Sequence, residues 1–145
     1  MKQVRQLIEG RSVFSASPDA NVLDVARTMT EKKIGAMPVI QNDRLVGIFS
    51  ERDLMTRVVA RELPPSTTKI SDVMSGDVAS VTPDEHLPEC IDRMQKNGYR
   101  HLPVMEGDRV VGMISLRDLL DCDRQDVRHE KEILAELVQE PIYDV

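Results

Sequence analysis

Residues 47–53 read Gly-Ile-Phe-Ser-Glu-Arg-Asp, and residues 112–118 read Gly-Met-Ile-Ser-Leu-Arg-Asp. Each stretch carries a glycine, two apolar residues typical of a strand, a serine, an arginine and an aspartate in the same register. The serine is a favourable residue for the start of a helix, and the aspartate follows three residues later. The two stretches lie 65 residues apart, as Asp53 and Asp118 do, and they indicate a duplicated unit.

Identical residues recur 65 positions apart along most of the chain, and the offset does not change. Examples are the pairs Val13 and Val78, Pro18 and Pro83, Met29 and Met94, Pro38 and Pro103, and Leu54 and Leu119. So many identities at one offset are not expected by chance, and the sequence therefore predicts two copies of one structural unit.

Each unit predicts the element order β-α-β-β-α. Apolar residues at helical spacing occupy 22–29 and 87–94, after the expected N-caps Asn21 and His86. Two apolar runs around an Asn, Asp or Gly turn then predict a hairpin, and a second helix begins after the serine. A short strand is expected at 13–16 and at 78–81. The fold class is mixed α/β (α+β), with two repeats packed as a pseudo-twofold pair.

The predicted organisation has five parts. The prolines near residue 64 exclude a helix interior and mark a linker. After Cys122 the repeat fails, although Ile133, Leu134, Leu137 and Val138 continue a helical spacing. We expect an N-terminal helical segment at 1–12, repeat 1 at 13–60, a linker at 61–69, repeat 2 at 70–122, and a C-terminal helical tail at 123–145.

Composition excludes several functional classes. The 145 residues carry a net charge of −6 and only 3% aromatic residues, which argues against nucleic acid as a partner. No apolar run is long enough for a membrane span, and no secretory signal begins the chain, so a cytoplasmic location is expected. Cys90 and Cys122 form no C-x-x-C motif.

No residue pattern predicts catalysis. The sequence has no nucleophile-base arrangement, no Gly-rich phosphate loop and no metal-ligand spacing, so we expect neither an enzyme nor a metal site. Cys90 lies on an apolar helical stripe, where core packing is the expected role.

The repeated Ser-x-x-Asp motif supports two interpretations. Amide groups at a helix start, with a serine and an arginine nearby, favour a phosphate, and an aspartate can accept ribose hydroxyls. Alternatively, Ser50 with Asp53 and Ser115 with Asp118 form capping boxes that only satisfy the helix ends. Residue chemistry alone leaves both interpretations open.

Tandem units with Gly-apolar-apolar-Ser-x-x-Asp after a Pro-Val strand resemble the CBS-domain pair, named for cystathionine β-synthase. Residues 72–74 (Asp-Val-Met) and 99–104 (Tyr-Arg-His-Leu-Pro-Val) are also typical of stand-alone bacterial members. The resemblance implies a regulatory, energy-sensing module in signal transduction. Its ligand would be an adenosine nucleotide (AMP, ADP, ATP or NAD), or S-adenosylmethionine, bound in clefts between the repeats, and the module would form a homodimer. The alternative is a structural dimerisation or protein-interaction module without a physiological nucleotide.

The resemblance also implies how the clefts are built. One cleft would bring Ser50, Arg52 and Asp53 against Tyr99, Arg100 and His101. The other would bring Ser115, Arg117 and Asp118 against Ile34, Gly35 and Ala36. Because the second set adds no basic or aromatic side chain, the cleft at Asp53 is expected to bind more tightly.

Overall fold

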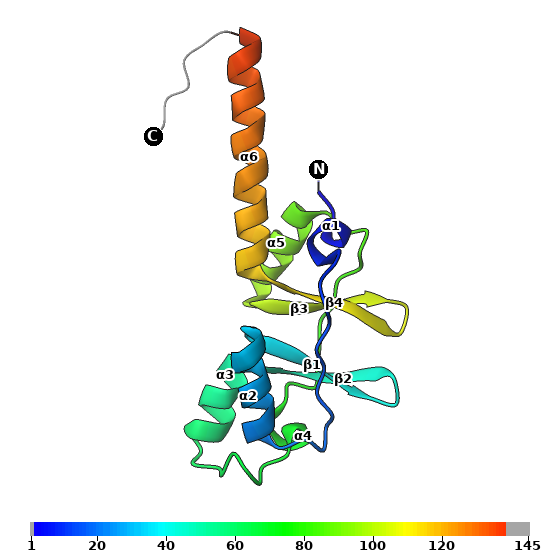
Figure 1. Cartoon of the computed structure of the whole chain (residues 1–145), viewed down its shortest axis with the longest axis vertical. Helices are drawn as coiled ribbons and strands as arrows, with labels where there is room; N and C mark the ends of the chain where they lie inside the picture. The colour runs from blue at the N-terminus through cyan, green and yellow to red at the C-terminus, as the bar shows by residue number, and fades with distance from the viewer. Residues whose placement is uncertain (1, 139–145) are drawn as a thin grey trace.

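The computed structural model describes residues 2–138, and Figure 1 shows two halves stacked along the long axis of the molecule. The lower half contains α2 (Val22–Lys32), β1 (Ala36–Gln41), β2 (Arg44–Ser50), α3 (Glu51–Asp53) and the π-helical stretch η1 (Leu54–Val59). The upper half contains α5 (Leu87–Asn97), β3 (His101–Glu106), β4 (Arg109–Ser115) and α6 (Leu116–Val138). This order confirms the expected mixed α/β fold of two tandem repeats.

Each repeat is built around one antiparallel hairpin. β1 pairs with β2 through a two-residue turn at Asn42 and Asp43, whose positive φ angles of 52° and 62° suit such a turn. β3 pairs with β4 in the same register, around Gly107. The expected first strands are shorter than predicted, because only Ala16 and Val81 form a parallel bridge, to Val39 and Val104.

The helix starts follow the sequence signals. The Asn21 side chain accepts a hydrogen bond from the Asp24 amide and caps α2. His86 precedes α5 without a side-chain cap, and a proline stands in the first turn instead. Helices begin directly after Ser50 and Ser115, so the repeated motif lies at the strand-to-helix junction of both repeats.

Each repeat completes its core with a helical turn from the segment that precedes the other repeat. The turn α1 (Val4–Ile8) comes before repeat 1 but buries Val4 completely in the core of repeat 2. The turn α4 (Ile70–Val73) comes before repeat 2 but buries Ile70 and Val73 in the core of repeat 1. In Figure 1 the chain accordingly runs from α1 in the upper half down into the lower half.

Backbone hydrogen bonds dock the two turns in equivalent ways. The Val4 amide donates to the Glu85 carbonyl, and the Ile70 amide donates to the Ala20 carbonyl, both at 2.9 Å. The match extends to packing, because a Cβ added at Gly112 would lie 2.6 Å from Ile8 Cγ2, and one at Gly47 would lie 2.6 Å from Met74 Sδ. The exchange of turns makes the two repeats one folding unit.

The last helix of repeat 2 and the described part of the tail form one continuous helix. α6 runs without a break from Leu116 to Val138 and projects beyond the upper half (Figure 1). The side chains of Leu137 and Val138 and the rest of the tail lie outside the described part of the structure. Between residues 2 and 138, no helix combines the length and apolarity needed to cross a membrane.

The close approach of Gly112 to Ile8 gives a test of the docked α1 turn. We expect Gly112→Ala to lower the free energy of unfolding by about 1–3 kcal/mol, because the new methyl overpacks the contact. In an Ile8→Ala background the same change should cost far less. Urea denaturation of the four proteins measures this double-mutant cycle.

Gly76 supplies the matched control, because a Cβ added there meets no atom within 4 Å and its φ is not positive. Gly76→Ala should be neutral or slightly stabilising. An equal cost of Gly112→Ala in both Ile8 backgrounds would show that α1 does not rest on β4.

Candidate functional site

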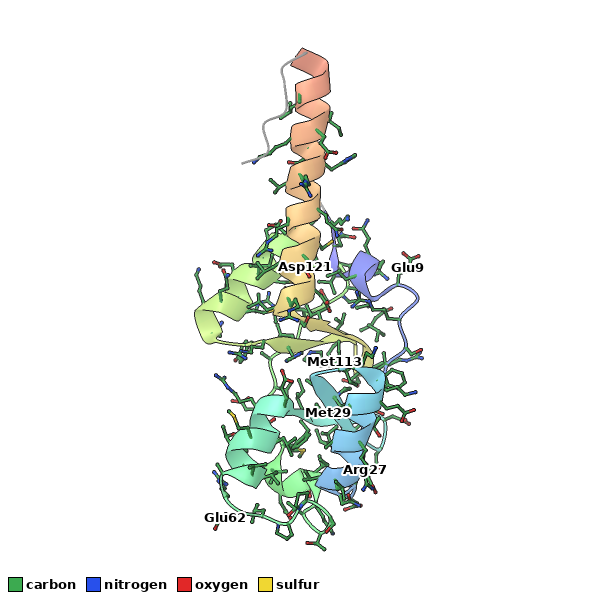
Figure 2. All side chains as sticks on the ribbon, turned by 60° about the vertical axis from the view of Figure 1, so that its left-hand side comes forward. Glu9, Arg27, Met29, Glu62, Met113 and Asp121 are labelled. Carbon is green, nitrogen blue, oxygen red and sulfur yellow. The ribbon has the colours of Figure 1, made fainter. Side chains whose placement is uncertain are left out.

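Two clefts of very different size lie where the repeated motifs meet the other repeat. The Asp53 cleft, lined by residues 50–53, Ser75, residues 77–79 and residues 98–102, encloses about 220 Å³. The Asp118 cleft, lined by residues 112–118 together with parts of α2, α6 and residues 11–14, encloses about 1170 Å³. Figure 2 labels three residues of the larger cleft, with Met29 below and Met113 and Asp121 above.

The carboxylate of Asp53 is buried and fully engaged by the protein itself. Asp53 as a whole is 6% exposed. Oδ2 accepts hydrogen bonds from the amide and the hydroxyl of Ser50, both at 3.0 Å, and Oδ1 accepts one from Ser75 Oγ at 3.1 Å. Arg57 Nε lies 3.6 Å from Oδ1. With the Asp53 amide donating back to Ser50 Oγ, the capping box is complete, so the capping interpretation describes this aspartate.

The carboxylate of Asp118 is held much more loosely. The Asp118 amide donates to Ser115 Oγ at 3.1 Å, which is only the backbone half of a capping box. Among the described residues, the carboxylate accepts a hydrogen bond from Arg11 Nη1, at 3.2 Å. The Asp118 side chain remains 39% exposed. An aspartate with open acceptor sites in a large cleft can receive hydroxyl groups from a ligand.

Two sequence differences between the repeats explain why the two aspartates behave differently. Arg57 pairs with Asp53, whereas the residue 65 positions later is Cys122, which carries no charge. Ser75 donates to Asp53. The segments of α1 and α4 correspond at an offset of 66 residues, as Ile8 and Met74 do, and the counterpart of Ser75 is therefore Glu9, which cannot donate from its side chain when ionised. Ser75 also pairs its backbone with Ile48 and so closes the edge of β2 over the smaller cleft.

The structure places the predicted residues in the expected pairs of segments. Ser50, Arg52 and Asp53 line one cleft with Tyr99, Arg100 and His101. Ser115, Arg117 and Asp118 line the other with Ile34, Gly35 and Ala36. Whether these residues bind a ligand remains a prediction.

The list of residues predicted for the Asp118 cleft is incomplete, because basic side chains from distant segments also line it. Its five arginine and lysine side chains are Arg11, Lys33, Arg100, Arg117 and Arg124, against three carboxylates at Glu51, Asp118 and Asp121. Arg11, Lys33 and Arg124 were not predicted from the sequence, because they lie outside the repeated motif. An excess of cations in a concave site favours an anionic ligand.

The amide groups at the helix starts are less available than the sequence suggests. The Leu116 amide donates to the Arg100 carbonyl at 2.8 Å, and the Glu51 amide donates to the Gly35 carbonyl at 2.9 Å. The third amide of each helix donates to its serine. Two of the first three amides are therefore already used, and phosphate recognition in either cleft depends mainly on side chains.

His101 forms part of the wall between the two clefts and lines both of them, as do Glu51 and Arg100. A Cβ added at Gly35 would lie 3.0 Å from His101 Nε2 and 3.3 Å from Glu51 Oε1, so glycine lets the repeats approach closely here. Burial lowers the pKa of His101 below its ordinary value of 6.5, and Arg100 acts in the same direction. The charges of Glu51 and Asp118 oppose this shift.

The cysteine chemistry of the chain lies away from both clefts. Cys90 is completely buried in the core of repeat 2, and burial raises its pKa to about 11. Such a thiol stays protonated and is a packing group, as its place on the apolar stripe predicted. Within residues 2–138, no group of three or more His, Cys, Asp or Glu residues is arranged to hold a metal ion.

The pKa of His101 predicts a pH dependence of folding. Because the unfolded chain binds this proton more readily, His101 does not affect stability above about pH 6.5. Stability falls as the pH drops from 6.5 towards the lowered pKa and levels off below it. We expect His101→Gln to flatten the loss of unfolding free energy between pH 7.5 and 5.5, measured by urea denaturation. His129→Gln, an exposed site on α6, is the control and should follow the parent profile. If the unfolding free energy of His101→Gln falls between pH 7.5 and 5.5 as much as that of the parent, His101 is not the source of the pH dependence.

Comparisons with known proteins agree with this architecture. The CBS domain family model matches residues 4–60 and 70–124. A CBS domain-containing mitochondrial protein of Arabidopsis thaliana, CBSX3, is 28% identical over 96% of this chain and 69% of its own length. Across four curated relatives that it matches, this chain spans 59% to 69% of the relative's length.

Solved structures extend the match to three dimensions. A putative signal-transduction protein with CBS domains from Burkholderia ambifaria superposes with a TM-score of 0.78, 28% identity and 99% coverage of both chains. The CBS domain pair of protein MJ0100, solved in complex with 5-methylthioadenosine and S-adenosyl-L-methionine, shares the fold with a TM-score of 0.77 at 20% identity, over 87% of this chain and 98% of that one. This chain belongs to the CBS-domain family, as a tandem pair of CBS domains.

Proposed function

We propose that this chain is a regulatory module that senses an adenosine nucleotide in the Asp118 cleft. The observation that carries the proposal is the open carboxylate of Asp118 in a cleft of about 1170 Å³ with five basic side chains. In this proposal the carboxylate accepts the ribose hydroxyls, and the basic side chains bind the phosphates. A volume of this size accommodates a nucleotide or a dinucleotide such as NAD.

The preference for this cleft reverses the ranking expected from the sequence. The Asp53 carboxylate already has three hydrogen-bond donors and an ion-pair partner, so a ribose there must displace internal contacts of a buried charge. The smaller cleft is lined by three carboxylates, Glu51, Asp53 and Asp77, but by only two arginines, Arg52 and Arg100, among the described residues. Tyr99, Arg100 and His101 therefore support binding less than their residue types suggest.

The shared fold of MJ0100 supports an adenosine-bearing ligand, because that protein was solved with two of them. We assign the module to sensing rather than catalysis, as the sequence pattern of the chain favours. The ligand panel that tests the proposal contains AMP, ADP, ATP, NAD and S-adenosylmethionine.

The first test measures ligand binding and the residues that carry it. We expect at least one panel member, at 100 times its dissociation constant, to stabilise the parent by about 2.7 kcal/mol in thermal unfolding. Asp118→Ala should lower the affinity for that ligand by about tenfold or more in calorimetry, because it removes charge-assisted hydrogen bonds.

Asp53→Asn is the matched control for this test. It should lower the stability of the fold, because it removes the charge that Arg57 pairs with, but leave the affinity nearly unchanged. A larger loss of affinity from Asp53→Asn than from Asp118→Ala would restore the ranking expected from the sequence. No stabilisation by any panel member would favour the structural dimerisation module instead.

We also propose that the module is a homodimer joined through the projecting part of α6. This part exposes Val127, Ile133 and Leu134, with 45%, 43% and 60% of their surface accessible. An isolated helix with exposed large apolar residues gains stability when it packs against another helix. A second copy of the chain offers the same surface, as a symmetric contact requires.

Light scattering tests the dimer at tens of micromolar. We expect a mass of about twice the 16.4 kDa chain for the parent, and the single-chain mass for the Val127→Glu/Leu134→Glu variant. Met55→Glu, on the exposed face of η1 in the other repeat, is the control and should remain dimeric. A monomeric parent would contradict the proposal. If Met55→Glu dissociates the dimer and the α6 variant does not, the interface involves η1 instead of α6.

A further inference from the structure

Arg11 occupies the Asp118 cleft from a segment outside both repeats. It follows α1, which rests on repeat 2, and it precedes the bridge at Ala16, which belongs to repeat 1. Residues 11–15 form neither helix nor strand. The Arg11 guanidinium donates to Asp118 Oδ2 at 3.2 Å, the carboxylate to which the proposed function assigns the ribose.

The Arg11–Asp118 ion pair can exchange its partners for a ligand more readily than the Arg57–Asp53 pair of repeat 1. The two side chains are 49% and 39% exposed, so water competes with the contact and the pair contributes little to stability. The Arg57–Asp53 pair has a nearly buried carboxylate, at 8%, and three further hydrogen bonds around it. A ligand can therefore separate Arg11 from Asp118 more easily than Arg57 from Asp53.

A nucleotide offers a new partner to both members of the pair. Its ribose hydroxyls donate to the Asp118 carboxylate, and its phosphate accepts from the Arg11 guanidinium, whose planar fork suits phosphate oxygens. A bare nucleoside offers a partner only to Asp118. To bind, the nucleoside must displace Arg11 from the Asp118 carboxylate, and it has no phosphate that could bind the Arg11 guanidinium instead.

We propose that Arg11 is a specificity-determining residue. It competes with unphosphorylated nucleosides for Asp118, and it stabilises bound nucleotides by donating hydrogen bonds to their phosphates. The inference rests on the proposed function, because it requires a nucleotide in the Asp118 cleft. It goes beyond that function by assigning discrimination between nucleoside and nucleotide to one side chain of the N-terminal segment. The other cations of the cleft attract phosphate, but of these basic side chains only Arg11 is hydrogen-bonded to the Asp118 carboxylate.

Calorimetric titration of the full chain with adenosine and with ATP tests the inference. In Arg11→Gln, we expect ATP to bind about tenfold more weakly, because a charge-assisted hydrogen bond to phosphate is lost. Adenosine should bind equally well or more tightly, because its competitor for Asp118 is gone. The ratio of the two affinities should therefore fall by about tenfold or more.

Arg5→Gln is the matched control, since Arg5 forms a similar exposed ion pair with Asp84 from the same N-terminal segment but lies outside both clefts. It should leave both affinities unchanged. If the parent binds ATP but Arg11→Gln weakens adenosine and ATP equally, or changes neither, the inference is overturned while the proposed function stands. If the parent binds neither compound, the inference is overturned, and the proposed function is overturned with it if no other member of the ligand panel binds.

Discussion

The exchange of α1 and α4 between the repeats is the constraint on which the rest of the structure depends. Each hairpin with its helices leaves part of its apolar face uncovered, and each receives the covering turn from the segment before the other repeat. Val4 and Ile70 are fully buried in this arrangement, where each contributes about 1.5–3 kcal/mol relative to exposure. The exchange ties the cores together, so the two strand-to-helix junctions are held against each other across the same interface.

Holding the junctions together creates two clefts, and small chemical differences then make them unequal. In repeat 1, Arg57 and Ser75 neutralise and cover the aspartate, which becomes part of the internal hydrogen-bond network. In repeat 2, Cys122 and Glu9 stand at the matching positions, so the Asp118 carboxylate stays partly exposed in a cleft. The same motif therefore serves as a cap in one repeat and as an open acceptor in the other. A buried, satisfied carboxylate stabilises a fold, whereas an exposed one can exchange partners.

The wall between the clefts connects their electrostatics. Glu51, Arg100 and His101 line both, so a charge bound in one cleft acts on the same side chains that face the other. Coulombic interactions over such short distances are weakly screened when the groups are partly buried. The absence of a Cβ at Gly35 lets His101 of repeat 2 lie close to repeat 1, next to Glu51.

The amino-acid sequence by itself determined the duplication, the element order and the positions of the two junctions. These features are local, because they depend on the spacing of apolar residues, on turn residues such as Asn42 and on the serine that starts each helix. Which aspartate is open depends on the tertiary structure, because Ser75, Arg57 and Arg11 reach the two aspartates from the segment after α4, from η1 and from the segment after α1. The sequence did carry one signal of the exchanged turns. Val4 and Ile70 are apolar residues 66 positions apart, one more than the 65 residues that separate the repeats, and this match relates α1 to α4. The larger cleft and its cations were not predictable in the same way, because Arg11, Lys33 and Arg124 meet only when the chain crosses between the repeats.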